Sequence, residues 1–190
     1  MMVLVLGTPN SGKSELAEEI AMKTGDPRRY YLATMQVLDE EGKRRVKRHR
    51  ALREGKGFLL IERETDIDQA AEKMQSPKEC TVLLECVSNL VGNELFDDPA
   101  GSFDQAEEGR SEALCERLCE KILSDIRTLA ESVHHLIVVS NTYELDVPGY
   151  DEQTRCYVRL LDQVNEGLIP MADQVYDLRK KALLTERMQH

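Results

Sequence analysis

The chain has 190 residues and a hydrophobic content of 41%, so we expect residues 1–190 to form a single domain with its own core. The formal net charge of −10 disfavours binding to nucleic acid or to an anionic membrane surface, and no apolar run near the start is long enough for a membrane span or a signal peptide. The five cysteines include no Cys-x-x-Cys pair and lie mostly in apolar stretches, which indicates reduced thiols in a cytoplasmic protein.

Short apolar runs alternate along the chain with longer amphipathic stretches, which is typical of βαβ units. In chain order we expect a strand over 2–6, a helix over 13–24, a strand over 30–34, a helix over 39–54, a strand over 58–62, a short helix over 67–74, a strand over 81–85, a long helix over 107–132, a strand over 136–140, a helix over 153–170 and a strand over 174–178. Because the strands are continuously apolar, we expect helices on both faces of a largely parallel sheet. Two turn-rich loops, 97–104 and 141–151, are expected beyond the carboxyl ends of strands, where such sheets bind ligands.

A glycine-rich motif follows the first expected strand directly and opens the first helix. It reads Gly7, Thr8, Pro9, Asn10, Ser11, Gly12, Lys13 and Ser14, a complete G-x-x-x-x-G-K-S. The backbone N–H groups of such a loop, with the helix N-terminus, surround the phosphates of a nucleoside triphosphate. Lys13 is expected to reach the β and γ phosphates, and the Ser14 hydroxyl to bind Mg²⁺. A glycine-rich turn without a ligand is the alternative, and it leaves the Lys-Ser pair unexplained.

A P-loop also needs a second carboxylate for the metal, normally at the end of another apolar strand. Glu85 ends the strand over 81–85 and is the best candidate, although a strand-end acid can also simply face solvent. Asn141 follows the strand over 136–140, so it is a candidate contact to the γ phosphate or to a substrate. As an isolated residue it equally fits the role of a turn former.

His49 lies in the middle of a basic segment, residues 43–56, which holds eight Lys or Arg residues and one acid, Glu54. On a helix, Arg45, His49 and Arg53 share one face. The cations would keep the imidazole neutral and nucleophilic while neutralising a triphosphate. The residues by themselves favour the simpler interpretation, a solvated basic helix. A nucleic-acid site is disfavoured because no aromatic residues interleave the cations.

The remaining candidate ligands carry no clear signal. His134 and His135 border an apolar strand, and the pattern assigns them no role. Cys115 and Cys119 lie four residues apart on an expected helix without His or Cys partners nearby, so core packing explains them better than metal binding.

Taken together, these features resemble the bifunctional adenosylcobinamide kinase and adenosylcobinamide-phosphate guanylyltransferase family over nearly the whole chain. Besides the glycine-rich loop, the most specific parts are the strand ending in Ala33 and Thr34, the helix start at Asp39 and Glu40, the series Arg45, His49, Arg50 and Arg53, and Val164-Asn165 followed by Ala172-Asp173. That family phosphorylates the aminopropanol arm of adenosylcobinamide and then attaches GMP through a guanylylated histidine. His49 matches this histidine by position, so the resemblance reverses the simpler interpretation of the basic segment.

The resemblance also implies a site and an architecture. Its catalytic residues are His49, Lys13 and Glu85, with Mg²⁺ held by Ser14 and Glu85. GTP or ATP and a small-molecule corrinoid are the implied substrates. The nucleotide contacts are the loop from Gly7 to Ser14 together with Thr34, Arg45, Arg50, Arg53, Glu62 and Asn141. The implied architecture is a P-loop NTPase-type three-layer α/β sandwich, mostly parallel with one antiparallel edge strand, in a homotrimer.

Two alternatives stay open. One is a P-loop kinase of another small alcohol without guanylyl transfer, and the other is a non-catalytic nucleotide-binding paralogue. The chain departs from the family pattern at Asn10, Thr142, Tyr143 and Asp162, near loops expected to touch nucleotide or corrinoid. Turnover of adenosylcobinamide separates the family activity from both alternatives.

Overall fold

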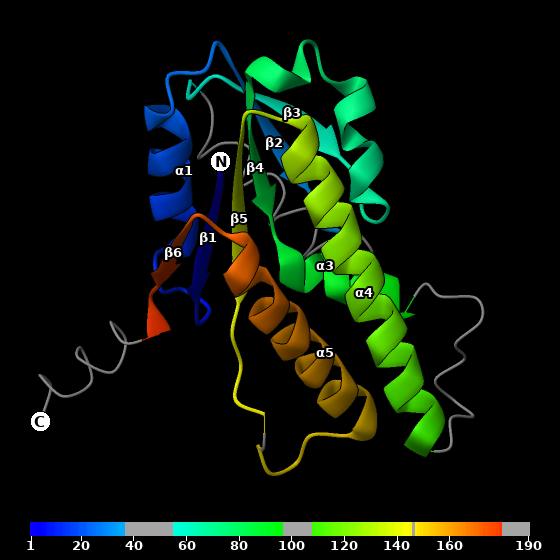
Figure 1. The fold of residues 1–190 in the computed structure, drawn as a ribbon. Helices are drawn as coiled ribbons and strands as arrows, with labels where there is room; N and C mark the ends of the chain where they lie inside the picture. Colours follow the sequence, from blue (N-terminus) through cyan, green and yellow to red (C-terminus); the bar gives the residue numbers. More distant parts are fainter. Residues whose placement is uncertain (37–54, 97–107, 146, 180–190) are drawn as a thin grey trace, which may run out of the picture.

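The computed structural model describes residues 1–36, 55–96, 108–145 and 147–179. Six strands form one sheet in the order β3-β2-β4-β5-β1-β6 (Figure 1). Their bounds are β1 (Met2–Gly7), β2 (Arg28–Ala33), β3 (Phe58–Glu62), β4 (Cys80–Glu85), β5 (His135–Asn141) and β6 (Gln174–Asp177). Each expected strand is therefore confirmed, with ends shifted by no more than two residues.

All pairings between these six strands are parallel. The two edge strands, β3 and β6, also run parallel to their neighbours β2 and β1, so the expected antiparallel edge strand does not occur in the described part of the chain. The physical reason lies in the connections. Where the structure describes a helix between two strands, that helix returns the chain to the same edge of the sheet, which produces parallel pairs.

Helices cover both faces of the sheet, as Figure 1 shows. One face packs against α1 (Lys13–Lys23), and the other packs against α3 (Val87–Phe96), α4 (Glu108–Ser132) and α5 (Glu152–Leu168). Alternate residues of β1 divide between these layers. Leu4 and Leu6 join the larger core under α3, α4 and α5, whereas Val3 and Val5 pack with Ala17 of α1. The three-layer α/β sandwich is thus confirmed.

The helices differ from expectation in two places. Residues 87–96 form α3, which the apolar run after β4 concealed, although Val87, Leu90 and Val91 are buried at helical spacing. The expected short helix over 67–74 is instead a 3₁₀ helix, η1 (Ile67–Lys73), and two further 3₁₀ turns, η2 (Pro77–Glu79) and η4 (Ile169–Met171), precede strands β4 and β6. The expected helix over 39–54 and the loop over 97–104 lie outside the described residues.

Two side-chain clusters connect helices on the face of the sheet that α3, α4 and α5 cover. The Lys121 ammonium of α4 contacts Asp66 at 2.9 Å, Glu94 at 2.7 Å and Asp125 at 3.0 Å. The Sγ atoms of Cys115 in α4 and Cys156 in α5 lie 2.8 Å apart in the buried contact between the two helices. None of the described helices combines the length and the apolar character that crossing a membrane requires.

Candidate active site

The glycine-rich loop joins β1 to α1 with residues 8–12. Asn10 and Gly12 adopt left-handed backbone angles, with φ of 62° and 87°. Gly7 has no room for a side chain, because a Cβ atom there would lie 2.5 Å from Ser11 Oγ. The N-cap residue of α1 is Gly12, which has no side chain that could accept hydrogen bonds from the first turn. The N–H groups of that turn are therefore available to an anion, as expected for a phosphate-binding loop.

Lys13 is the first residue of α1, and its side chain folds back over the loop. Its Nζ atom donates a hydrogen bond to the Thr8 carbonyl oxygen at 2.8 Å, and the residue is only 7% exposed. Burial lowers the pKa of the Lys13 ammonium, and the nearby side chains of Cys86 and Glu85 partly offset this effect. A buried cation with one carbonyl partner gains strongly from an anionic ligand.

Glu85 ends β4 and faces the first turn of α1. The Ser14 hydroxyl donates to Glu85 Oε1, and the Tyr31 hydroxyl donates to Glu85 Oε2 at 3.0 Å. Fold topology thus joins residues that are 71 positions apart in sequence. A hydroxyl and a carboxylate in contact form the hard oxygen pair that Mg²⁺ prefers. Ser11 Oγ is also buried and has no hydrogen-bond partner in the described part of the chain, so the residues fit a hydrated cation bound together with phosphates.

Two further expected contacts lie at the same edge of the sheet. Thr34 is fully buried, and its Oγ1 donates to the Cys86 carbonyl oxygen at 2.8 Å while accepting from the Cys86 N–H at 2.9 Å. This hydroxyl therefore fixes the end of β2 beside Glu85. Glu62 is exposed, and both Glu62 and Glu85 pair in register with Ala33, from opposite sides of β2.

Asn141 ends β5 directly beside Gly7 of β1. Its Nδ2 donates to Ser88 Oγ at 2.7 Å, and its carbonyl oxygen accepts from Asn165 Nδ2 at 3.0 Å. Asn165 Oδ1 and Thr142 Oγ1 are buried without a hydrogen-bond partner in the described part of the chain. Such unpaired polar atoms beside a phosphate-binding loop are candidates for contact with bound substrate or water.

Sequence reasoning gave no role to Tyr31, Ser88 or Asn165 in this network. What the sequence shows at these positions is a polar residue where the strand or helix pattern predicts burial. Periodicity could identify such positions, but it could not identify their partners.

The structure describes only the residues that flank the basic segment and its last two positions. His49, Arg45, Arg50 and Arg53 lie outside the described residues. Gln36 lies three residues beyond the carboxyl end of β2, the edge that carries Glu85. At the other flank, the Lys56 ammonium forms an ion pair with the buried Glu18 of α1. Both flanks are therefore attached to elements that form the loop site.

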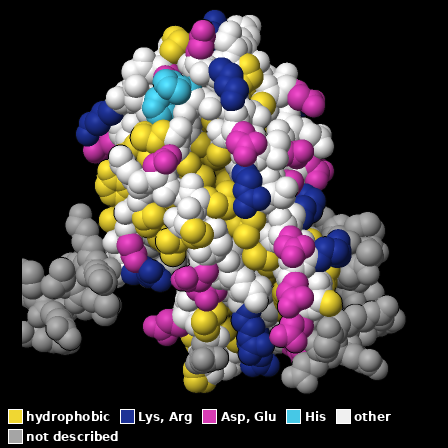
Figure 2. Space-filling view, viewed as in Figure 1, with side chains coloured by type: hydrophobic (Ala, Val, Ile, Leu, Met, Phe, Trp, Pro, Cys, Tyr) yellow, Lys and Arg dark blue, Asp and Glu magenta, His cyan; other side chains and the backbone are white. Residues whose placement is uncertain are grey.

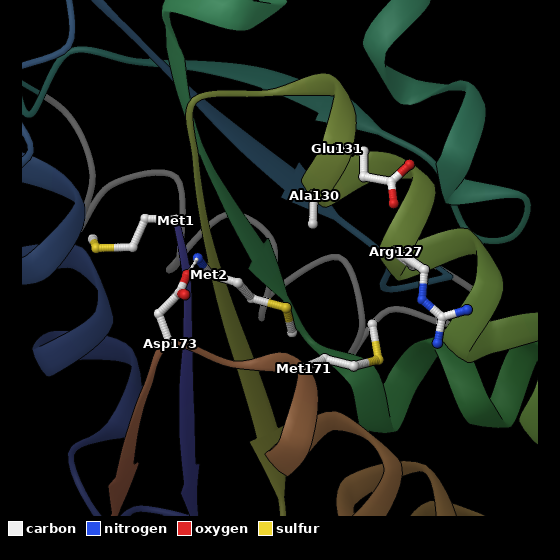
Figure 3. A pocket seen from close by; sticks show the side chains of 7 residues that line it. All are labelled: Met1, Met2, Arg127, Ala130, Glu131, Met171 and Asp173. Atoms are coloured by element: carbon white, nitrogen blue, oxygen red, sulfur yellow. Dashed lines mark hydrogen bonds between the residues drawn. The ribbon is translucent and has the colours of Figure 1, made fainter.

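A separate open cavity of about 350 Å³ lies at the opposite edge of the sheet (Figure 3). Met2 at the start of β1, Met171 and the Arg127 side chain of α4 contribute to its lining. Because the glycine-rich loop follows the carboxyl end of β1, this cavity is distinct from the loop site.

The parallel sheet, the loop between β1 and α1, and the contact of Ser14 with Glu85 define a P-loop nucleotide-binding α/β protein. The family model described as cobinamide kinase / cobinamide phosphate guanyltransferase matches residues 3–180, and the chain belongs to this family.

Curated relatives agree in length as well as in sequence. The chain is 30% identical over 177 residues to the bifunctional adenosylcobalamin biosynthesis protein CobU of Escherichia coli K12, covering 93% of this chain and 94% of the relative. It is 28% identical to the CobU protein of Salmonella typhimurium, with the same coverage. It is 30% identical to the bifunctional protein CobP of Pseudomonas aeruginosa, covering 92% and 91%. Among solved structures, an ATPase domain aligns with a TM-score of 0.48 at 14% identity, covering 93% of this chain and 68% of that one.

Proposed function

We propose that the chain is an enzyme of cobalamin biosynthesis that phosphorylates adenosylcobinamide and then transfers GMP from GTP to adenosylcobinamide phosphate. Family membership supports both activities. The structural observation that carries the kinase step is the contact between Ser14 and Glu85 beside the buried Lys13. Its location at the end of a P-loop follows the arrangement that phosphoryl transfer requires.

In the kinase step, the loop N–H groups and Lys13 bind the phosphates of ATP or GTP. Ser14 and Glu85 would hold Mg²⁺, which neutralises developing phosphate charge when it is bound. Tyr31 holds the Glu85 carboxylate in place. The hydroxyl oxygen of the corrinoid arm forms a bond to the γ phosphorus, and the bond from that phosphorus to the β-phosphate oxygen breaks. The nucleoside diphosphate leaves, and the hydroxyl proton passes to solvent.

In the guanylyl step, the neutral imidazole of His49 attacks the α phosphorus of GTP and pyrophosphate leaves. Arg45, Arg50 and Arg53 would stabilise the charge on both the transition state and the leaving group. The phosphate of adenosylcobinamide phosphate then displaces the imidazole and takes up GMP, which restores His49. Two observations support the proposal: Gln36, before this segment, lies just beyond the carboxyl end of β2, and Lys56 forms an ion pair with Glu18 of α1.

The decisive experiment is labelling of the purified protein with GTP and Mg²⁺. We expect incorporation of label from the α position but not from the γ position, in a bond that is acid-labile and base-stable, as a phosphoramidate is. His49→Ala should abolish the adduct and retain kinase activity, because Lys13 and Ser14 serve that step. His190→Ala is the matched control and should label like the wild type.

Two results would contradict the proposal in different ways. Equal labelling of His49→Ala, or no labelling of the wild type, would exclude guanylyl transfer through His49 and leave a simple alcohol kinase. Nucleotide binding without turnover of adenosylcobinamide or any other alcohol would identify a non-catalytic paralogue. The proposal also includes a cytoplasmic homotrimer, for which light scattering of the purified protein gives the mass.

A further inference from the structure

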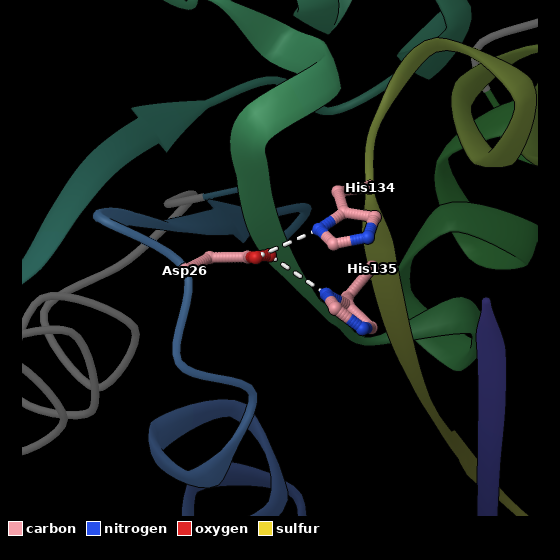
Figure 4. Close-up of side chains that lie close together, drawn as sticks. All are labelled: Asp26, His134 and His135. Atoms are coloured by element: carbon pink, nitrogen blue, oxygen red, sulfur yellow. Dashed lines mark hydrogen bonds and ion pairs between the residues drawn. The ribbon is translucent and has the colours of Figure 1, made fainter.

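A cluster of one carboxylate and two imidazoles lies at the amino-terminal edge of the sheet, opposite the P-loop (Figure 4). Asp26 follows α1, His134 precedes β5, and His135 is the first residue of β5. His134 Nδ1 lies 2.8 Å from Asp26 Oδ1, and His135 Nδ1 lies 2.7 Å from Asp26 Oδ2. Residues 108 positions apart in sequence thus direct three candidate ligand groups toward one another.

We propose that Asp26, His134 and His135 form a binding site for a divalent transition-metal ion of the Zn²⁺ type. Two imidazole nitrogens and one carboxylate oxygen form a donor set that suits Zn²⁺ and related ions. The candidate ligand atoms all lie within 4.8 Å of one another. Tetrahedral Zn²⁺ with bonds of about 2.0 Å separates its ligand atoms by about 3.3 Å, so the two imidazole–carboxylate distances of 2.8 Å and 2.7 Å need to lengthen by about half an ångström.

The Asp26 carboxylate is held in place by groups that a metal would not displace. Thr81 Oγ1 donates to Asp26 Oδ2 at 2.7 Å, and the hydroxyls of Thr24 and Thr81 lie 2.7 Å apart. The backbone N–H of His134 donates to the Cys80 backbone carbonyl oxygen at 3.1 Å, which fixes the backbone that carries both imidazoles. Such outer contacts orient the ligands of established metal sites.

The cluster is closed on one side and open on the other. The Asp26 and His135 side chains are 6% and 14% exposed, whereas the His134 side chain is 56% exposed. Histidine side chains reach the surface in Figure 2, so an ion has an entry path and room for a water ligand. When a metal binds Nδ1, a neutral imidazole keeps its proton on Nε2, so no net loss of a proton is required.

In a second cluster of candidate ligands, a lysine side chain occupies the position that a cation would take. Asp66, Glu94 and Asp125 also converge, but the Lys121 ammonium contacts all three. In the described part of the chain, the side chains that bond to Asp26 are neutral or titratable hydrogen-bond donors and not a lysine or arginine. The histidine cluster can therefore accept a cation, whereas the lysine-filled cluster cannot.

The test is calorimetric titration of the nucleotide-free full-length protein with Zn²⁺, in excess Mg²⁺ to saturate hard oxygen sites. We expect one equivalent of Zn²⁺ to bind the wild type, and His134→Ala, Asp26→Asn and His135→Ala each to weaken it by at least about tenfold. Co²⁺ should give visible d–d bands with the wild type and no thiolate charge-transfer band. Zn²⁺ should also raise the melting temperature of the wild type but not of His134→Ala.

Asp125→Asn, in the lysine-filled cluster, is the matched control and should bind Zn²⁺ like the wild type. Because the His134 side chain is largely exposed, His134→Ala should fold even if Asp26→Asn does not. Absence of Zn²⁺ binding by the wild type would show that Asp26, His134 and His135 only stabilise the fold through their hydrogen bonds. Unchanged binding by His134→Ala, or a thiolate band with Co²⁺, would place the metal elsewhere, and either result overturns the proposal.

Discussion

Side-chain hydrogen bonds connect strand β4 to the two ends of helix α1. The carboxyl and amino ends of β4 differ in how many of the nearby polar groups have a hydrogen-bond partner. At the carboxyl end, Ser14 binds Glu85, while Ser11 Oγ nearby remains without a hydrogen-bond partner in the described part of the chain. At the amino end, Thr24 binds Thr81, and both oxygens of the adjacent Asp26 carboxylate are paired. The unpaired Ser11 hydroxyl at the carboxyl end favours nucleotide binding, whereas the Thr24–Thr81 contact at the amino end favours rigidity. Changes at the carboxyl end should therefore alter nucleotide affinity, and loss of the Thr24–Thr81 contact should alter stability.

The largest effect is expected at the carboxyl end, from Lys13→Ala. Removal of the buried ammonium should lower Mg²⁺-dependent affinity for GTP or ATP by at least about 100-fold, since charge-assisted phosphate contacts are lost. The protein should still fold. Lys23→Ala, in the last turn of the same helix, is the control, because the Lys23 side chain is 78% exposed and its ion pair with Glu19 lies on the surface. Calorimetry with both variants decides, and unchanged affinity in folded Lys13→Ala would refute the P-loop assignment.

Glu85→Gln, at the carboxyl end of β4, should affect catalysis and nucleotide binding to different extents. The neutral amide should reduce kcat by roughly 100-fold or more and leave nucleotide affinity within about tenfold, because the carboxylate stabilises transition-state charge more than the ground state. Tyr31→Phe, which removes only the bond that orients Glu85, should have a smaller effect in the same direction. Steady-state kinetics provide the measurement. Wild-type turnover in Glu85→Gln would move the metal role elsewhere, with Asp97 or Asp98 as the next candidates.

Lys121→Met tests a carboxylate cluster that lies outside both ends of β4. It should lower the free energy of unfolding by about 1–3 kcal/mol and leave nucleotide affinity unchanged, since three carboxylates lose their shared cation. Burial alone lowers the pKa of Lys121, but its hydrogen bonds to Glu94, Asp66 and Asp125 raise that pKa above its usual value. From neutral pH up to pH 10.5, the usual lysine pKa, the stabilisation is therefore complete, and it is lost as the pH rises further.

Urea unfolding of wild-type and Lys121→Met proteins at pH 7 and above pH 10.5 checks this prediction. The difference between the two proteins should narrow at the higher pH. A constant difference would show that packing of the lysine stem, and not its charge, accounts for the stabilisation.

The smallest effect is expected from Thr24→Val at the amino end. Valine keeps the shape but removes the hydroxyl that pairs with Thr81, so the free energy of unfolding should fall by about 1 kcal/mol. Nucleotide affinity should match that of the wild type. Urea unfolding and calorimetry on one preparation give both numbers. A parallel loss of nucleotide affinity would show that the two ends of β4 are not independent.

Local patterns identified most of the fold and the centre of the site. The strands were predictable because continuous apolar runs mark buried parallel strands, and the loop was predictable because its eight residues are contiguous. Glu85 was predictable from its place at a strand end. Helix α3 was not, since it begins two positions after the last residue of β4 and no glycine or proline separates them. The antiparallel edge strand came from family resemblance, and no periodicity in the chain supported it.

The contacts that complete the two ends of β4 were beyond sequence reasoning. Tyr31 reaches Glu85 across 54 residues, and His134 reaches Asp26 across 108. Such pairs depend on strand order, which apolar periodicity does not determine. The bend before β5 also lets two consecutive histidines face the same carboxylate, whereas strict strand alternation would direct them to opposite faces.

Because Cys115 and Cys156 lie close together, we expect them to form a disulfide bond when the purified protein is stored under air. A covalent link between them would join residues 41 positions apart and, by chain entropy, add about 4 kcal/mol to the stability of the folded state. The same contact slows the reaction, because the hydrogen bond to Cys156 and burial raise the pKa of the Cys115 thiol and leave little thiolate to react. Preparations stored without a reductant should therefore drift slowly toward a more stable form, and unfolding curves from fresh and stored protein should not be pooled.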